Sequence, residues 1–455
     1  RLLPSISVET ESADKEYRLS AKSTALEYAG EHIGGALWQY FEGQGDAERA
    51  LAAMKDASRY TRGHLSRDAV HALYGGAVTL SASRMDMARS CHFAYFMRYG
   101  LKARERTGAG FDAPQIGTFV HDVMEHTLRQ AKECGGLHTL SKDKLHALVR
   151  ASIEEYIDRV LPDLCEKSAR FRYLFNRLCA TVERIMDEVS EELQSSDFEP
   201  LAFELEFGAD GQLPAITIRE ENGTARVVGK VDRVDGWLHD GKLYLRVVDY
   251  KTGKKSFDLA ELRYGLGLQM LLYLFTLKEE GQMLFGGHEI VPAGVLYTPA
   301  REPMLRCARD TEPETIEKAL KKELRRSGMV LEDPAVLQAM EHSALESPCY
   351  LPIAVKRDGA VTGSLASAEQ LGKLSKYVDH ILHEITQEVF AGNIDADPYA
   401  RTPQQSACTY CEFASACHFE NGCGSDRMEY IKATKNDEFW QYIDEVNGEG
   451  AHENG

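Results

Sequence analysis

An Asp-Gly dipeptide at Asp240-Gly241 constrains the fold more than any other feature of the sequence, because it separates two β-rich segments. Residues 227–237 and 243–250 are rich in valine, leucine and aromatic residues, and Asp-Gly between such runs predicts a tight hairpin. If Asp240 and Gly241 are the centre of the turn, the numbers of facing residues sum to 481. Asp232 then faces Asp249, and Lys230 faces Lys251. Because side chains alternate along a strand, these two acids and two lysines share one face of the hairpin.

Two opposed carboxylates repel each other unless another charge compensates them. A divalent cation is the natural compensation, and magnesium prefers hard oxygen ligands while it keeps several waters. Such an ion lowers the pKa of a bound water and neutralises charge on a phosphate. A neighbouring lysine can stabilise the transition state or orient the nucleophile. The hairpin therefore indicates phosphodiester hydrolysis, and the alternative is a surface hairpin with ordinary charges.

The two strands carry the motifs Gly229-Lys-Val-Asp-Arg-Val-Asp235 and Val247-Val-Asp-Tyr-Lys-Thr-Gly253. Both closely resemble the core of the PD-(D/E)XK nucleases of the RecB-like class. The resemblance implies an α/β chain with a restriction-endonuclease-like core, a mixed sheet flanked by helices. It also implies a magnesium-dependent or manganese-dependent deoxyribonuclease.

Two helical motifs extend this resemblance. Gln269 and Tyr273 match the Gln-x-x-x-Tyr motif of the class, and their i, i+4 spacing places them on one helix face. Gly117 and His121 resemble its Gly-x-x-x-His helix, in which the histidine is a further metal ligand or stabilises that end of the site. His126 is a less well aligned alternative.

The resemblance assigns roles to the residues that match these motifs. The strand 201–207 displays Glu204 and Glu206 on one face, and the resemblance favours Glu204 as the acid near the metal. The implied metal ligands are Asp232, Asp249, the backbone carbonyl of Tyr250, and His121. The implied catalytic set is Asp232, Asp249, Lys251, His121, Glu204, Gln269 and Tyr273.

Three of the ten cysteines form a C-x2-C-x5-C pattern at Cys408, Cys411 and Cys417. Zinc or a 4Fe-4S cluster would need a fourth ligand, for which His418, Cys423 and Cys91 are the candidates. The segment 90–101 is similar to the sequence around the lone N-terminal cysteine of iron-sulfur nucleases, especially the AddB family. That resemblance implies a 4Fe-4S cluster held by Cys91, Cys408, Cys411 and Cys417, an iron-sulfur staple joining the two ends of the nuclease region. The other cysteines are expected to be buried free thiols.

The overall charge limits how DNA could bind. Lys and Arg number 53 against 71 Asp and Glu, a net charge of −18, which argues against nucleic-acid binding over the whole surface. A local basic track is required, and Lys254, Lys255 and Arg263 are its nearest candidates. The sequence has no apolar stretch of about 20 residues and no signal peptide, so we expect a cytoplasmic protein that does not enter membranes.

The length of 455 residues suggests about three domains. We expect a helical accessory segment at 1–79, a nuclease domain at 80–425 with a charged helical insertion at 305–350, and a C-terminal tail at 426–455. Helices are expected from 81 onwards and at 117–132, 145–193, 262–277 and 371–390, with a further strand at 291–297.

The AddB resemblance implies an exonuclease in recombinational repair that cuts the 5′-ended single strand from an unwound double-strand end. No Gly-x-x-x-x-Gly-Lys-Ser/Thr motif is present, so an AddA-like helicase-nuclease partner would supply ATP hydrolysis. Residues 1–79 would then be the tail of an inactive helicase-like region. The alternatives are a non-catalytic DNA-end scaffold and a stand-alone iron-sulfur nuclease of the CRISPR-adaptation type.

Overall fold

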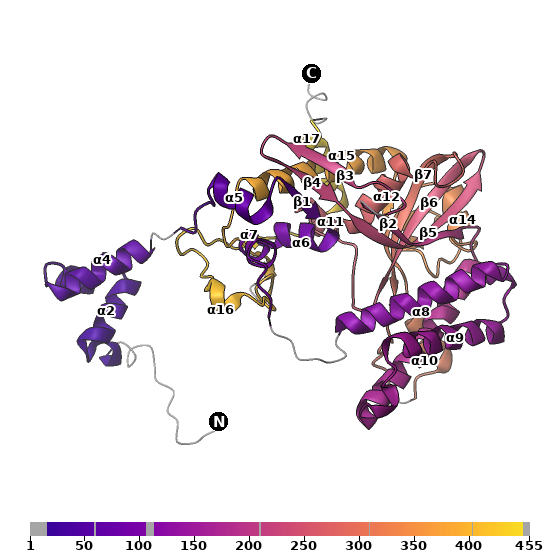
Figure 1. Ribbon diagram of the computed structural model, residues 1–455, viewed down its shortest axis with the longest axis horizontal. Coiled ribbons are helices and arrows are strands. Elements are labelled where there is room, and N and C mark those ends of the chain that lie inside the picture. Colours follow the sequence, from indigo (N-terminus) through magenta and orange to yellow (C-terminus); the bar gives the residue numbers. More distant parts are fainter. Residues whose placement is uncertain are drawn as a thin grey trace. The chain divides into compact units, whose positions relative to one another are not determined.

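The computed structural model describes residues 16–58, 61–105, 113–208, 211–308, 310–402 and 404–448. The chain divides into two compact units, each made of separate stretches of sequence (Figure 1). Unit 1 comprises Arg1–Ala69, Ser90–Arg104 and Gly392–Tyr430, and unit 2 comprises Val70–Arg89, Glu105–Ala391 and Ile431–Gly455. The expected segments 1–79, 80–425 and 426–455 stay predictions, and their ends at 1–15 and 449–455 lie outside the described residues.

A six-stranded mixed sheet forms the centre of unit 2. β6 and β7 are parallel, as are β8 and β11, while the other neighbours are antiparallel. The expected mixed sheet is therefore confirmed. In spatial order its strands are β11 (Leu365–Ala366), β8 (Ser327–Leu331), β7 (Glu289–Pro299), β6 (Lys242–Lys251), β5 (Gly229–His239) and β2 (Glu199–Phe207).

The hairpin of β5 and β6 has the register that the Asp-Gly turn predicts. Its pairs run from Arg233 opposite Val248 to His239 opposite Lys242, and each pair of numbers sums to 481. Asp240 and Gly241 have φ of +49° and +77°, the two positive values that a type I′ turn requires. Asp232 and Asp249 are the next residues in this register.

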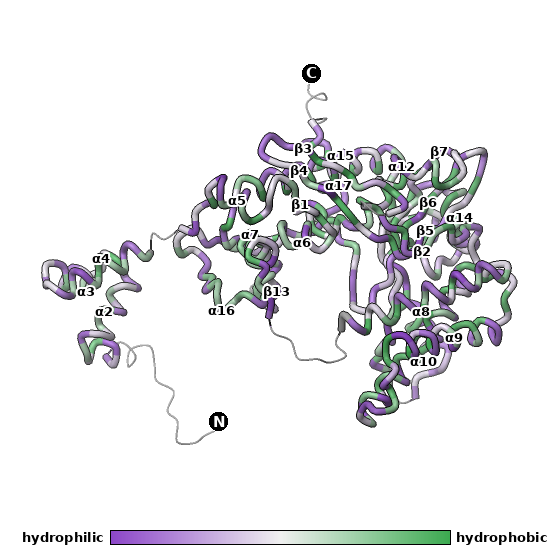
Figure 2. The backbone as a smooth tube through the Cα atoms, in the orientation of Figure 1, coloured by the Kyte–Doolittle hydropathy of each residue, from purple (hydrophilic) through white to green (hydrophobic). Residues whose placement is uncertain are grey.

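Helices flank the sheet. α12 (Gln269–Glu280) packs against β6 and β7, whereas α8 (Ala113–Glu133), α9 (Lys142–Val160) and α10 (Ala169–Gln194) pack against one another (Figure 1). In Figure 2 the strands of the sheet carry long hydrophobic stretches, and α8 to α10 are mixed, as amphipathic helices are. The remaining helices of unit 2 are α6 (Ala82–Ser90), α11 (Leu259–Arg263), α13 (Pro313–Glu323), α14 (Pro334–Met340), α15 (Ala368–Phe390) and α17 (Asn436–Val446).

Two of the expected helices are interrupted. The segment 145–193 forms α9 and α10, because Pro162 disfavours helix at the preceding residue and Ser168 then caps a new start. The segment 262–277 forms α11 and α12, because Gly265 and Gly267 adopt φ of +74° and +68°.

The expectation of a mostly helical insertion at 305–350 is wrong for Ser327–Leu331, which forms β8 of the central sheet. Gly328 permits this pairing, since a Cβ there would lie 1.9 Å from the Val295 carbonyl oxygen. The tail is not wholly irregular either, because α17 packs on α15 and α11.

Unit 2 contains two smaller sheets. β1 (Ala77–Leu80), β4 (Gly223–Val227) and β3 (Ile216–Glu220) form one, on which α15 packs, and β9 (Ile353–Val355) pairs with β10 (Val361–Gly363). Short 3-10 helices cover Leu137–Thr139 and Leu164–Glu166. α5 (Arg67–Tyr74) links residues of the two units.

Unit 1 combines short helices with a small sheet. Its N-terminal helices share a core that includes Trp38, Phe41 and Leu51. Among the described residues of both units, no helix is long and apolar enough to cross a membrane. The elements of unit 1 are α2 (Lys22–Glu31), α3 (Ala36–Phe41), α4 (Asp46–Ser58), α7 (His92–Tyr95), a π-helix (Phe96–Gly100), β12 (Tyr399–Thr402), β13 (Gln405–Ser406), α16 (Ala414–Cys417) and β14 (Glu429–Tyr430).

A buried ionic network lies between the hairpin and α10. Asp235 is bound by Arg233 at 2.8 Å and by Arg246 at 2.9 Å, with all three side chains fully buried. Glu192 of α10 receives Arg326 at 2.7 Å. Burial opposes the charge of Glu192, but the three arginines overcome it and lower its pKa to about 2.

We expect Glu192→Gln to destabilise the chain by about 3 kcal/mol at pH 7, because breaking a buried ion pair leaves uncompensated charge. The pKa of Glu192 lies below its ordinary 4.5, so this contribution is complete above about pH 4.5 and is lost as the pH falls towards 2. Urea unfolding at pH 7 and at pH 3 measures both effects. Glu191→Gln, one position away on the exposed face, is the matched control, and equal losses from both variants would contradict the prediction.

Candidate active site

Three potential metal ligands from three different elements meet at one end of the sheet. A nitrogen of His121 in α8 and carboxylate oxygens of Glu204 in β2 and Asp232 in β5 all lie within 4.8 Å of one another. The antiparallel register of β2 and β5 places Glu204 across from Asp232, since Phe203 pairs with Arg233 and Leu205 with Val231. The structure therefore brings together three of the residues that the sequence predicts.

Tyr250 connects two of these ligands through its backbone. Its N–H donates to Asp232 Oδ2 at 2.8 Å, and its carbonyl oxygen lies 3.0 Å from His121 Nε2. The other ring nitrogen of His121 lies 3.3 Å from Asp232 Oδ2. Burial lowers the pKa of His121, but the Asp232 hydrogen bond and the surrounding acids raise it by more. The predicted carbonyl ligand thus lies at the same site.

Asp249 lies beside this group but is paired differently. Its side chain is almost fully buried, and Oδ2 lies 2.6 Å from Lys251 Nζ. Burial first, and then the charge of Asp232, raises the pKa of Asp249 to about 6. The Asp-x-Lys motif therefore holds an ion pair next to the three-ligand group.

The two strand acids differ in exposure. Lys230 Nζ lies 2.6 Å from Glu204 and 3.5 Å from Glu206, so both acids face the same side as predicted. The Glu204 side chain is only 13% exposed and the Glu206 side chain 55%, and only Glu204 is within reach of His121 and Asp232. His126 is not in this group, because its Nδ1 lies 2.8 Å from the Asp122 carbonyl of its own helix.

Gln269 and Tyr273 form a hydrogen-bonded pair at the start of α12. Gln269 Nε2 lies 3.2 Å from Tyr273 Oη, and burial raises the pKa of Tyr273 to about 12, so its hydroxyl stays protonated at neutral pH. The Tyr273 ring packs edge-on against Phe207 at 5.2 Å. A Cβ on Gly229 would lie 2.5 Å from this ring, so glycine is what lets β5 approach it.

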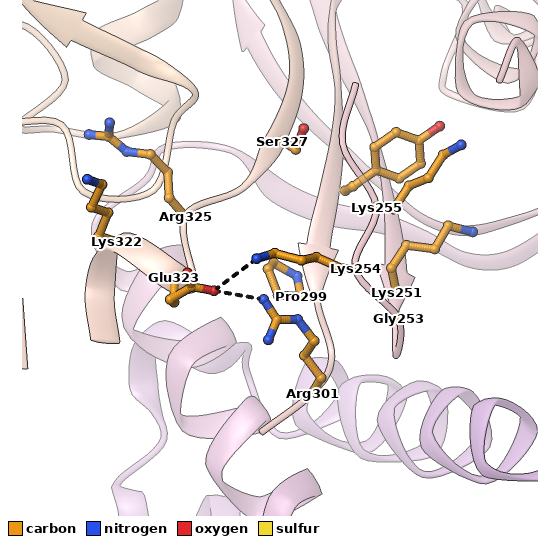
Figure 3. A pocket seen from close by; sticks show the side chains of 11 residues that line it. Lys251, Gly253, Lys254, Lys255, Pro299, Arg301, Lys322, Glu323, Arg325 and Ser327 are labelled. Atoms are coloured by element: carbon orange, nitrogen blue, oxygen red, sulfur yellow. Dashed lines mark hydrogen bonds and ion pairs between the residues drawn. The ribbon is translucent and has the colours of Figure 1, made fainter. Parts of the chain in front are cut away.

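The basic candidates separate into two places. Lys254 and Lys255 line a pocket together with Lys251, whereas Arg263 stacks over the Tyr442 ring at 4.5 Å and does not line that pocket. Figure 3 shows further cations in the pocket, namely Arg301, Lys322 and Arg325. These three were not predicted from the sequence, because two of them belong to the segment expected to be an insertion and the third lies just before it. The basic residues of 321–326 were the signal that could have found them.

The four predicted cluster cysteines all belong to unit 1. Cys91 precedes α7 and is buried, which raises the pKa of its thiol to about 12, with a further contribution from Cys417. The pKa of Cys408 is also raised, by burial and then by the charges of Cys411 and Cys417. These thiols therefore interact electrostatically with one another.

The expectation of buried thiols is wrong for the other six cysteines. Cys134, Cys165, Cys307 and Cys423 are exposed, and Cys179 and Cys349 are partly exposed. The general tendency of cysteine to be buried does not hold for them, because they occur in loops, in a short 3-10 helix and on partly exposed helix faces.

Most of the sequence is similar to that of known nucleases. The family model described as the PD-(D/E)XK nuclease superfamily matches residues 79–418. The chain is 30% identical over 422 residues to the AddB subunit of the ATP-dependent helicase/deoxyribonuclease of Ruminiclostridium cellulolyticum, covering 90% of this chain and 36% of that protein. The proteins of the same name from Acetivibrio thermocellus and Clostridium botulinum (strain Loch Maree) are 32% and 30% identical, over 90% and 91% of this chain and 35% and 36% of theirs. The chain thus spans about a third of the length of these relatives, and the resemblance inferred from its motifs is confirmed.

We expect Gly229→Ala to destabilise the chain by about 1–3 kcal/mol, because its Cβ would overlap Tyr273 and Phe207. Gly253→Ala is the matched control, since a Cβ there would meet nothing within 4 Å. Urea unfolding measures the stability, and tyrosine fluorescence or ultraviolet difference spectra report the surroundings of Tyr273. Equal stabilities for the two variants would contradict this close packing.

Proposed function

Because the chain belongs to the PD-(D/E)XK nuclease superfamily, we propose that it hydrolyses phosphodiester bonds of single-stranded DNA with the aid of a divalent metal ion. The observation that most supports this function is the convergence of His121, Glu204 and Asp232 beside the Asp249–Lys251 pair. Structural ion pairs need no such convergence of donors from a helix and two strands.

The donor set fits magnesium or manganese. Asp232, Asp249 and the Tyr250 carbonyl offer hard oxygen atoms, and His121 adds an imidazole nitrogen that manganese accepts readily. When bound, the ion would lower the pKa of a water molecule and neutralise negative charge on the phosphate. Glu204 would act as a further acid at the edge of the site.

The other residues orient the reacting groups. His121 bridges Asp232 and the Tyr250 carbonyl, so it holds both oxygen atoms in place. Lys251 is held by Asp249, and its ammonium group can donate to a phosphate oxygen that becomes more negative as the bond breaks. The pair Gln269–Tyr273 supplies neutral hydrogen-bonding groups beside the same hairpin.

The wider setting is a proposal that rests on the relatives. They are named as subunits of an ATP-dependent helicase/deoxyribonuclease, so we assign this chain to the nuclease part of an AddAB-type complex in DNA repair and recombination. An AddA-like partner would supply ATP hydrolysis, and the strand ending 5′ would be the substrate. Co-purification of such an ATPase with the protein from its native host tests this assignment.

We also propose that Cys91, Cys408, Cys411 and Cys417 hold one 4Fe-4S cluster. Four thiols in one compact unit are a suitable donor set, and the mutual electrostatic interaction of three of them supports their proximity. Zinc on the same thiols is the alternative chemistry. In either case the bound metal would join 90–104 to 392–430 within unit 1.

We expect Asp249→Ala to reduce magnesium-dependent cleavage of single-stranded DNA to below about one hundredth of the parent rate, since one ligand and the partner of Lys251 are lost. Stability should be unchanged or higher, because the variant removes a buried carboxylate whose ionisation burial opposes. Glu206→Ala, an exposed acid on the same face, should cut at the parent rate. A purified Asp249→Ala protein with full activity would refute the site.

We expect Cys411→Ser to lower the melting temperature and to expose the segment after Ala400 to protease, because a cluster that binds only the folded state adds to folding stability. Cys423→Ser, at an exposed cysteine outside the proposed set, should do neither. Anaerobically purified protein should contain iron and sulfide. A colourless protein with one bound zinc would exclude the cluster and retain the joining role.

A further inference from the structure

A strongly cationic pocket adjoins the candidate active site. Its volume is about 190 Å³, and it lies between the loop after β6 and the segment from the end of β7 to the start of β8. Six of its eleven lining residues are lysine or arginine and only one is acidic, in a chain whose net charge is −18. The basic residues are Lys251, Lys254, Lys255, Arg301, Lys322 and Arg325.

The single carboxylate, Glu323, compensates only part of this charge. Arg301 Nη2 lies 3.1 Å and Lys254 Nζ 3.9 Å from the same Glu323 oxygen (Figure 3). In that view Lys322 and Arg325 lie to the left of Glu323. Among the residues that the structure describes, neither has a carboxylate within 4.0 Å, and Arg325 donates to the Pro348 carbonyl instead. Cations gathered in this way attract an anion.

The pocket also offers a neutral hydrogen-bond donor. The Ser327 hydroxyl accepts the Phe257 N–H at 2.7 Å, so its own proton is free to point to a ligand in the pocket. A hydroxyl, arginine forks and ammonium groups together match the oxygen atoms of a phosphate group.

We propose that this pocket binds a phosphate group of the substrate strand next to the phosphate that is cut. Lys251 carries the argument, because it lines the pocket and is also paired with Asp249 of the candidate active site. The proposal rests on the proposed nuclease function, and it names the two walls that grip the strand. One wall is Lys254 and Lys255, and the other is Arg301 and Lys322.

The test uses the 455-residue chain and a fluorescent single-stranded oligonucleotide in EDTA, so that binding is measured without cleavage. We expect Lys322→Glu to weaken binding about tenfold, and Arg301→Gln to weaken it less. Loss of one phosphate contact should also reduce the slope of log affinity against log salt by about 0.7. Lys321→Glu is the matched control, because Lys321 neighbours Lys322 on α13, pairs with Glu317 and does not line the pocket.

Three oligonucleotides identify the source of the phosphate. Equal losses for 5′-hydroxyl, 5′-phosphorylated and circular strands assign the pocket to an internal phosphodiester. A loss confined to the 5′-phosphorylated strand assigns it to a terminal phosphate, and both results support the proposal. Circular dichroism and melting temperature establish that Lys322→Glu and Arg301→Gln are folded.

Parental affinity and salt slope in folded Lys322→Glu and Arg301→Gln would overturn the pocket, as would a parent chain that does not bind the oligonucleotide. The proposed function is tested separately, by cleavage with magnesium. A parent chain that binds through the pocket but never cuts would refute the nuclease function alone, and a chain that cuts while both variants bind normally would refute the pocket alone.

Discussion

The pairing of β5 with β6 through the Asp240-Gly241 turn determines where every charged group of unit 2's hairpin lies. Because side chains alternate, one face carries Asp232, Asp249 and Lys251, and the other carries the arginines and Asp235 of the buried network. A slip of one residue would exchange the two sets, placing arginines at the metal-ligand group and carboxylates against α10. The type I′ turn excludes that slip through two residues with positive φ.

Tyr250 joins the two faces. Its hydroxyl accepts a hydrogen bond from Arg233 at 2.7 Å within the buried network, while its backbone N–H and carbonyl contact Asp232 and His121 on the site side. Burial raises the pKa of Tyr250, so the hydroxyl remains neutral among the charges. The rigid ionic layer behind the hairpin therefore supports the geometry of the candidate site in front of it, and the stability of one depends on the other.

Local signals predicted the parts of this architecture that local geometry determines. The turn residues alone give the register, and the spacing of Gln269 and Tyr273 gives their shared face. Period-two alternation could not separate Glu204 from Glu206, because both face Lys230 and only the approach of α8 distinguishes them. β8 was missed because its place in the sheet depends on Gly328 meeting Val295, a contact between distant segments. The buried arginines were unforeseeable for a similar reason, since their partner Glu192 comes from a remote helix.

The discontinuity of unit 1 sets an order of events during synthesis. The stretch Ser90–Arg104 must wait for Gly392–Tyr430, and Cys408 is made 317 residues after Cys91. At about 5–20 residues per second a ribosome needs roughly 16–60 s to cover that interval. All six strands of the central sheet are translated within it. The Cys91 thiol therefore leaves the ribosome long before its neighbours exist, and the cell must keep it reduced while the sheet of unit 2 assembles.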